Sequence, residues 1–379
     1  MRFAFNDEQR ALQESARKFL ENANSVERVL TLMETPTGFD PNVWKQLSAE
    51  LGWTALTIPE AFGGYGLSHA DLTPLMEEMG RSLLCAPFFS TLCLGANALL
   101  LGGSPEQKQT YLPSIASGAL TATLAWQEPD SPWQQDPIQA TVIRDGASFI
   151  LKGHKAHVVD GHTAGLLIIA ARSPNTTGDA GVSLFLVPAD TPGLVRTHTP
   201  TLDQTRKQAT LQLDNLHLPE SHLLGPWEDG AKLLTTTRLL AGVALAAEQV
   251  GAAERCLDTT VQYAKDRVQF GRPIGSFQAI KHKCADMMVQ VESARSAAWY
   301  AAWVASHNPS ELPTAAAIAQ AFCSEALFHC AAESVQIHGG IGFTWEHETH
   351  LYFKRAQSSR TLLGTPQHHR EHLAREIGL

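Results

Sequence analysis

The sequence has little positive charge, and its basic residues are not clustered. The 379 residues include 29 Lys and Arg against 38 Asp and Glu, which gives a formal net charge of −9. Beyond the short Lys-His-Lys segment at 281–283, we find no basic cluster. A protein that binds nucleic acid usually presents a basic surface to the phosphates. We therefore expect no nucleic-acid partner.

The sequence also lacks the spacing of a metal site or a disulfide framework. Its six cysteines are scattered, and three lie in apolar helical patterns, where free cysteine behaves as a small hydrophobic residue. Among the histidines, His347 and His350 approach the His-Glu-x-x-His motif but are one residue too close, and His368-His369 adds no ligand pattern. We expect no metal site and a reducing compartment.

Targeting and membrane-spanning patterns are absent as well. The N-terminus, MRFAFNDEQRAL, lacks the basic and apolar regions of a signal peptide. The apolar run near residues 239–247 is too short to cross a bilayer. With 44% hydrophobic and 18% charged residues, the chain has ample material for a packed core. These features predict a cytoplasmic globular protein that does not bind membranes.

Hydrophobic periodicity divides the chain into three segments. Residues 1–118 show helical periodicity, residues 119–226 alternate like strands, and residues 227–379 are helical again. We predict an α+β fold with an N-terminal helical domain, a central antiparallel β-barrel or sandwich domain and a C-terminal four-helix bundle. The bundle helices are expected at 228–266, 277–307, 312–339 and 349–377. In the central segment, Asp145-Gly146 predicts a type I′ hairpin turn.

Two glycine-containing breaks interrupt the C-terminal helical pattern. The first runs from Arg267 to Gly275, and the second reads Gln336-Ile-His-Gly-Gly340-Ile-Gly-Phe343. A guanidinium suits a diphosphate, and paired glycines let the backbone approach a ligand closely. We therefore predict an anion site at the first break. The alternative is that Arg267 caps a helix and the glycines merely turn the chain.

The α–β–α order and these two breaks together resemble the acyl-CoA dehydrogenase family over nearly the whole chain. Supporting segments are IPEAFGGYGL at 58–67, QKQTYLPSIASG at 107–118 with a strand ending in Glu128-Pro129, and FGRPIGSFQAIKHKCADM at 270–287. The combination is more specific than any one motif, because a lone His-Gly-Gly is a weak signal. The chain is also similar to subunits of heteromeric bacterial enzymes that act on steroid side-chain CoA thioesters.

The resemblance implies a flavoprotein that removes the α and β hydrogens of an acyl-CoA thioester. A carboxylate takes the α proton, the β hydrogen leaves as hydride to flavin N5, and the electrons pass to an electron-transfer flavoprotein. Arg267 and Gln269 would bind the FAD pyrophosphate across a subunit interface of a homo- or hetero-oligomer, a dimer or tetramer. The positions that match cofactor-binding residues are Arg267, Gln269, Phe270, Phe277, Gln278, Gln336, Gly339, Gly340, Thr365 and Gln367.

The usual positions of the catalytic carboxylate are empty. The commonest one, before a Gly-Thr near the C-terminus, holds Leu363, and the alternative on the preceding helix falls on Ala241. Neither side chain can accept a proton. Glu248 lies seven residues beyond Ala241 on the same helical face, among small residues and without Lys or Arg at helical spacing. Desolvation would raise its pKa, so we predict Glu248 as the base; the alternative is a solvated surface residue.

The central segment departs from the family at the flavin. Glu128-Pro129 is followed by Asp-Ser-Pro-Trp-Gln-Gln where family members have a Gly/Ser-rich turn, and an expected Trp-x-Thr/Ser reads His157-Val158-Val159, without a hydroxyl. Trp126 and Trp133 could stack on flavin, although we favour the core for both. The half of the flavin site that a subunit builds for itself is weakened, whereas the half that it lends to a neighbour is intact. This asymmetry predicts a hetero-oligomer that shares FAD.

Three functions fit these observations. The first is an FAD-dependent dehydrogenase with Glu248 as base, acting on a bulky, branched or steroid side-chain acyl-CoA. The second is a non-catalytic or half-site subunit that completes a partner's flavin site, and the third is a flavin oxidase or monooxygenase. Tyr352, Lys354 and Arg355, on a late helix, could face phosphate or solvent, and we favour solvent.

Overall fold

The computed structural model describes residues 5–129 and 138–379. Its described residues form two compact units. The first, which we call the helical unit, comprises residues 1–31, 69–84 and 242–379; the second, the sheet unit, comprises residues 32–68 and 85–241. The six cysteines are all free.

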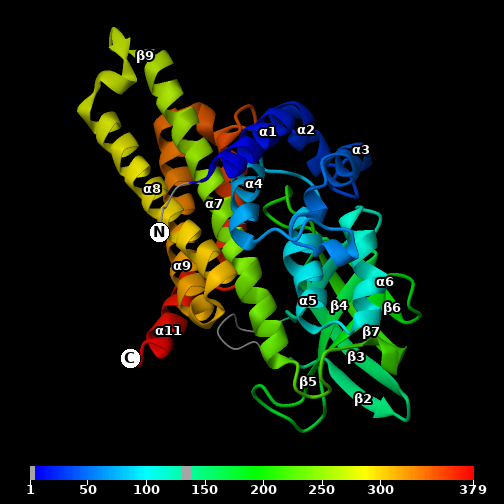
Figure 1. Cartoon of the computed structure of the whole chain (residues 1–379). Helices are drawn as coiled ribbons and strands as arrows, with labels where there is room; N and C mark the ends of the chain where they lie inside the picture. The colour runs from blue at the N-terminus through cyan, green and yellow to red at the C-terminus, as the bar shows by residue number, and fades with distance from the viewer. Residues whose placement is uncertain (1–4, 130–137) are drawn as a thin grey trace. The chain divides into compact units, whose positions relative to one another are not determined.

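The helical unit is built from long helices joined by short connections (Figure 1). Its N-terminal helix begins with a capping box, in which Asn6 accepts from the Gln9 backbone and Gln9 bonds back. The helices are α1 (Asp7–Ala23), α4 (His69–Arg81), α7 (Ala231–Asp266, which starts in the sheet unit), α8 (Gln278–His307), α9 (Leu312–His338), α10 (Thr349–Leu362) and α11 (Pro366–Glu376); α2 (Val26–Met33) continues into the sheet unit.

Helix α9 is the central helix of this unit and packs against α8, α10 and α11. Its sequence is rich in alanine, and most of its residues are buried. The segment Pro309–Phe343 is apolar and long enough to cross a membrane, with a mean hydropathy of 1.2, but 67% of that window is buried inside the protein. This burial is what a core helix shows.

Helices α4 and α7 approach until their backbones touch, at two reciprocal glycines. A Cβ at Gly80 of α4 would lie 1.8 Å from the Glu248 carbonyl oxygen, and a Cβ at Gly251 of α7 would lie 1.7 Å from the Glu77 carbonyl oxygen. No other residue type leaves room for such an approach. The crossing therefore fixes Glu77 and Glu248 on opposite sides of one tight contact.

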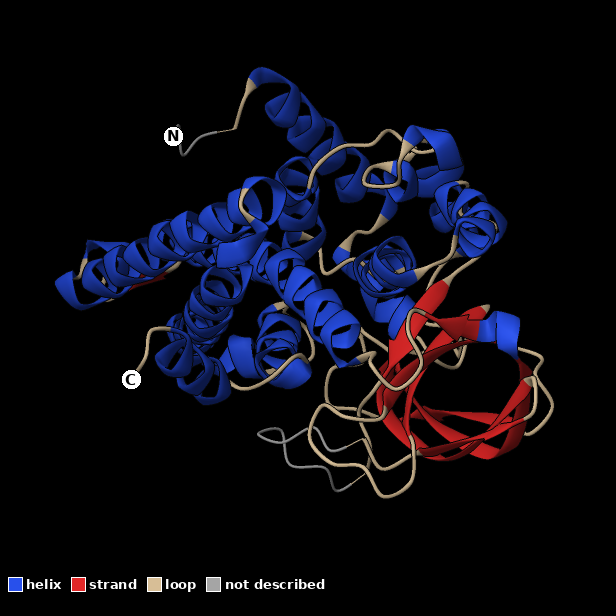
Figure 2. Cartoon of the chain, turned by 60° about the horizontal axis from the view of Figure 1, so that its bottom comes forward, coloured by secondary structure: helices blue, strands red, loops and turns tan. Residues whose placement is uncertain are grey.

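The sheet unit holds an eight-stranded mixed sheet with the order β6-β7-β3-β2-β4-β5-β8, and β1 pairs with β4. The strands are β1 (Ala122–Ala125), β2 (Thr141–Asp145), β3 (Ser148–Val159), β4 (Leu166–Arg172), β5 (Val182–Pro188), β6 (Leu194–Thr199), β7 (Gln208–Pro219) and β8 (Leu223–Leu224). They curve around a common interior (Figure 2), where Phe149 packs on Phe185 and Trp227.

Shorter helices complete the sheet unit. They are α3 (Pro41–Lys45), α5 (Asn97–Gly102) and α6 (Pro105–Ala116), with π-helical segments at Gln46–Glu50 and Phe89–Ala96 and short 3-10 turns at Trp53–Ala55, Glu60–Phe62 and Glu220–His222. Ser104 caps α6 through a capping box with Gln107.

The predicted fold class is confirmed, with three differences in detail. The pairings β1–β4 and β2–β4 are parallel, because strands joined by long connections need not return as hairpins. The hairpin at Asp145-Gly146 forms, but φ is positive at Gly146 and not at Ala147, as in a type II′ rather than the predicted type I′ turn. The last helical run is broken after Leu362, where Gly364 has φ +122°.

We expect Gly251→Ala to destabilise the protein. Alanine favours an isolated helix by about 1 kcal/mol over glycine, but here its methyl group would collide with the Glu77 carbonyl and push α4 from α7, so a net loss of about 3 kcal/mol or more is expected. Urea unfolding measures the change. Gly340→Ala is the matched control, because no atom lies within 4 Å of its Cβ position. Equal stability of the two variants would contradict the tight crossing.

Candidate functional site

The first predicted anion segment forms an exposed hairpin between α7 and α8 (Figure 1). Strands β9 (Val268–Gln269) and β10 (Arg272–Pro273) pair across Phe270 and Gly271, whose φ values are both positive, as in a type I′ turn. The Arg267 carbonyl accepts from the Ile274 backbone at 2.8 Å, which closes the loop. Phe270 is 91% exposed.

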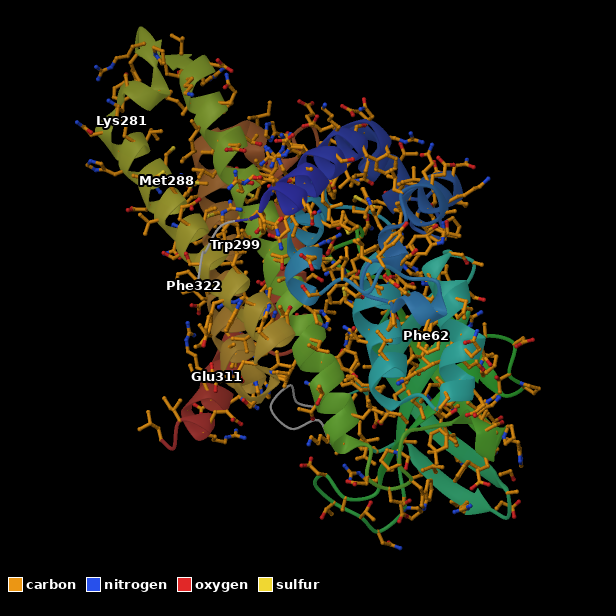
Figure 3. All side chains as sticks on the ribbon, viewed as in Figure 1. Phe62, Lys281, Met288, Trp299, Glu311 and Phe322 are labelled. Carbon is orange, nitrogen blue, oxygen red and sulfur yellow. The ribbon has the colours of Figure 1, made fainter. Side chains whose placement is uncertain are left out.

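Aromatic and cationic side chains gather around this hairpin. Phe270 meets Phe277 edge to face at 6.1 Å, and the Arg272 guanidinium lies 4.1 Å from the Phe277 ring centre. Phe277 is the N-cap residue of α8, and Gln278 is its first residue. Farther along α8, Lys281 and Met288 project to the outside (Figure 3). The hairpin thus offers a guanidinium, the exposed Phe270 ring and the half-buried Phe277 ring, which suit a phosphate joined to a planar base.

The second predicted segment is the turn that ends α9. Gln336 is exposed, and the chain continues into a 3-10 turn, Gly339–Phe343. Gly339 has φ +63°, and neither Gly339 nor Gly340 has an atom within 4 Å of its Cβ position. The backbone is therefore open to a closely approaching ligand.

The structure brings these two segments to the same end of the helical unit. Tyr263 lies one helical turn before Arg267, and its hydroxyl donates to the His338 carbonyl at 3.3 Å. Lys283 near the start of α8 forms an ion pair with Glu333 near the end of α9. We call Arg267–Gln278 together with Gln336–Phe343 the helix tip. The helix tip contains eight of the ten predicted cofactor-binding residues.

Thr365 and Gln367 lie elsewhere, at the break between α10 and α11. Thr365 is the N-cap of α11 and accepts from the His368 backbone at 3.2 Å, while Gln367 is exposed. Helix α11 packs on α9 and is joined to it by the Arg370–Glu325 ion pair. Glu325 precedes Gln336 by eleven residues, which is roughly 16 Å along α9. Thr365 and Gln367 therefore form a group separate from the helix tip.

Both usual positions of the base are apolar and buried. Leu363 is 4% exposed, and Ala241 is fully buried. Leu363 ends α10 with the non-helical backbone that leads into Gly364. Neither position can take part in proton transfer.

Glu248 is buried and ion-paired. It is 4% exposed, and its Oε1 accepts from Arg355 Nη1 of α10 at 2.8 Å. As expected, no Lys or Arg lies at helical spacing from Glu248 on α7. Its carboxylate is nevertheless paired, because α10 supplies Arg355. Arg355 and Tyr352 are 2% and 4% exposed, so the expectation that they face solvent is wrong. A guanidinium this close favours the ionised carboxylate.

In the sheet unit, Glu128 is held within the protein rather than offered to a ligand. Its two oxygens accept from the backbones of Gln139 and Ala140, each at 2.9 Å, and it is ion-paired with Lys155, which is fully buried. The six residues that follow Pro129, including Trp133, lie outside the described residues. Trp126 is buried beside Arg238, as expected for a core residue.

The tripeptide His157-Val158-Val159 lies at the end of β3. His157 has φ +54° at a register shift of the strand, and its Nδ1 lies 3.1 Å from Gln208 Oε1. Val158 and Val159 are buried. These three side chains offer no hydroxyl to a flavin ring, whereas the helix tip has the exposed guanidinium and open backbone that fit an FAD diphosphate.

Sequence reasoning missed Arg355 and the contact between Tyr263 and His338. The available signal for Arg355 was Leu351 and Tyr352 one helical turn before it, which place the arginine next to an apolar stretch of the helix. Among residues 5–129 and 138–379, no group of three or more His, Cys, Asp or Glu side chains could hold a metal ion. His347 instead contacts the His338 ring at 4.4 Å, and His368 lies beside His369.

We expect Glu248 and Arg355 to be strongly coupled in stability. Arg355→Met removes the cation beside a buried carboxylate and should cost about 3–5 kcal/mol, whereas adding Glu248→Gln should recover part of that loss. A double-mutant cycle in urea should give a coupling energy of at least about 1 kcal/mol. The exposed Arg370–Glu325 pair is the matched control, with a coupling below about 1 kcal/mol. Additive effects at Glu248 and Arg355 would refute a coupled pair.

The chain is similar to known proteins over nearly its whole length. The family models for the N-terminal, middle and C-terminal domains of acyl-CoA dehydrogenases match residues 6–119, 123–216 and 228–378. The chain is 37% identical over 375 residues to acyl-CoA dehydrogenase IpdE2 of Mycolicibacterium smegmatis, covering 98% of this chain and 99% of that protein.

Two solved structures share the fold over their whole length. The Tcur3481-Tcur3483 steroid acyl-CoA dehydrogenase variant aligns with a TM-score of 0.88 and 31% identity, over 98% of each chain. PigA with FAD and proline aligns with a TM-score of 0.92 and 27% identity, over all of both chains. The likeness to an FAD-containing structure, together with the family match, confirms FAD as the expected cofactor. The chain belongs to the acyl-CoA dehydrogenase family and is an oxidoreductase of that kind.

Proposed function

We propose that this chain takes part in the α,β-dehydrogenation of an acyl-CoA thioester with a bulky, branched or steroid side-chain acyl group. The electrons then pass to an electron-transfer flavoprotein. Family membership supports the reaction type. The likeness to a steroid acyl-CoA dehydrogenase supports the acyl group. The six free cysteines support the proposed cytoplasmic location, because disulfides are rare in reducing compartments.

Glu248 is the proposed base. The observation that carries this assignment is the burial of its carboxylate, which is 4% exposed, in a site with little water. Arg355, 2.8 Å away, keeps that carboxylate ionised and able to accept a proton, while it also makes it a weaker base. In the proposed reaction the α C–H proton goes to Glu248 and the β hydrogen leaves as hydride, which forms the C=C bond. Bound FAD supplies the hydride acceptor.

The helix tip is proposed to serve a flavin shared with another acyl-CoA dehydrogenase-like subunit. It is exposed, and its guanidinium and open glycines suit a diphosphate, whereas Val158 and Val159 of the sheet unit lack a hydroxyl. The solved steroid relative, Tcur3481-Tcur3483, is named for two proteins, which is consistent with a two-protein assembly. In this arrangement each subunit would contribute part of the cofactor site.

A second candidate is a half-site subunit that completes its partner's flavin site without supplying the base. The apolar Leu363 favours it, because the usual base position is buried and has no proton acceptor. The ion pair favours it too, since a carboxylate held by a guanidinium is a weaker base than an isolated buried one. The two candidates differ in what Glu248 does, so a substitution there separates them.

We expect Glu248→Gln to abolish turnover of the assembled enzyme while FAD stays bound. Gln retains the size and can still meet Arg355, but it cannot accept the α proton, so a loss of at least about a hundredfold is expected. The rate is measured with an electron-transfer flavoprotein as acceptor, and oxygen uptake alone tests for an oxidase. Glu14→Gln on the exposed face of α1 is the control. An unchanged rate after Glu248→Gln would instead support the half-site subunit.

We expect the chain expressed alone to retain less than one FAD per chain and to gain flavin when co-expressed with its partner subunit. The reason is that its exposed cofactor residues lie on the helix tip, while its sheet unit lacks the hydroxyl donors. Absorbance at flavin wavelengths after gel filtration measures the ratio. A fully yellow, fully active preparation of the single chain would overturn sharing with a different subunit.

A further inference from the structure

Three aromatic rings from the two sides of the Gly339–Phe343 turn and from α7 contact one another, one pair stacked and one pair tilted. Tyr263 of α7 lies on the ring of His338, the last residue of α9, with centres 4.3 Å apart and planes 28° apart. The His338 ring also contacts the ring of His347, which precedes α10, with ring centres 4.4 Å apart. These ring contacts therefore join the residues on both sides of the turn to the end of α7.

Hydrogen bonds hold the same turn at its two ends. The Tyr263 hydroxyl donates to the His338 carbonyl at 3.3 Å, and the Thr349 hydroxyl donates to the Gly342 carbonyl at 3.0 Å. His338 Nδ1 lies 2.7 Å from the Ser334 carbonyl, and because a carbonyl only accepts, that ring nitrogen carries the hydrogen. This bond fixes the orientation of the His338 ring.

The two histidine rings are suited to contact each other in their neutral forms. Burial lowers the pKa of His338 and that of His347, so the imidazoles meet without repulsion between two positive charges. Glu348 raises both pKa values by a smaller amount, and Arg255 lowers that of His347. Contact between two neutral rings is therefore the state that the surroundings favour near pH 7.

Between these contacts the turn is open. Gly339 and Gly340 have no neighbour within 4 Å of their Cβ positions, and Phe343 and Trp345 are 85% and 71% exposed. Gly342, in contrast, is buried against Val335 and His338 at the end of α9, so the open part of the turn is the Gly339-Gly340 backbone, which depends on the contacts on either side of it. The Tyr263 backbone carbonyl accepts from the Arg267 backbone N–H at 2.8 Å, so the ring of Tyr263 stands one helical turn before Arg267 on α7.

We infer that Tyr263, His338 and His347 act as positioning residues, holding the Gly339-Gly340 backbone in a fixed place relative to Arg267 so that both can meet one FAD diphosphate. This inference rests on the proposed role of the helix tip in binding FAD. None of the three side chains needs to touch the cofactor. Their contribution is preorganisation, because a turn already in its bound shape loses less freedom on binding.

The test compares two substitutions of Tyr263 in the assembly in which the chain purifies. Tyr263→Phe removes the hydroxyl and keeps the ring, whereas Tyr263→Leu removes both. After flavin is stripped, FAD is titrated back, and amide hydrogen exchange of Gly339–Phe343 is followed without FAD. We expect Tyr263→Leu to weaken FAD binding about tenfold and to speed exchange, and Tyr263→Phe to fall between it and the wild type.

Tyr300→Phe is the matched control, because that hydroxyl bonds to Glu311 at the opposite end of α8. Tyr300→Phe should change neither the FAD affinity nor the amide exchange of Gly339–Phe343. Unchanged exchange in Tyr263→Leu would overturn the positioning role, as would faster exchange with unaltered FAD affinity. Failure of the wild-type assembly to rebind FAD would instead count against the proposed role of the helix tip, so the two ideas fail in different ways.

Discussion

The backbone contact between α4 and α7 is the constraint on which the helical unit depends. Gly80 and Gly251 let each helix touch a carbonyl of the other, and the crossing sets the direction of the two acidic side chains beside it. Glu248 meets Arg355 of α10, whereas Glu77 meets Arg295 and Trp299 of α8. Burial raises the pKa of Glu77 to about 7, against the effects of Arg295 and Trp299. Four helices are thus tied to one crossing by buried polar contacts.

The distribution of polar groups separates two kinds of site within one chain. Near the α4–α7 crossing, charged side chains are buried and paired, which favours a fixed geometry and little water. At the helix tip, Arg267, Phe270 and the Gly339-Gly340 backbone are exposed. The first arrangement suits chemistry or stability inside the chain, and the second suits a ligand that another subunit also contacts.

Local features were predictable from the sequence, whereas long-range pairings were not. Helix ends near 266, 307 and 338 follow from glycine, proline and the loss of apolar periodicity, and the structure places them within a residue. The break at Leu363 was also signalled, since Gly364, Thr365 and Pro366 are helix-ending and helix-starting residues in order, but the periodicity on both sides concealed it. Arg355 is 107 residues from Glu248, so no local pattern could pair them.

The central claim is that the helix tip of this chain binds the diphosphate of a flavin that a second subunit shares. The most direct measurement is a density map of the FAD-loaded assembly. We predict that the diphosphate contacts Arg267 and the Gly339-Gly340 backbone of this chain. The isoalloxazine ring should contact the sheet domain of the neighbouring subunit. A diphosphate without contact to Arg267, or a flavin held entirely by one subunit, would contradict it.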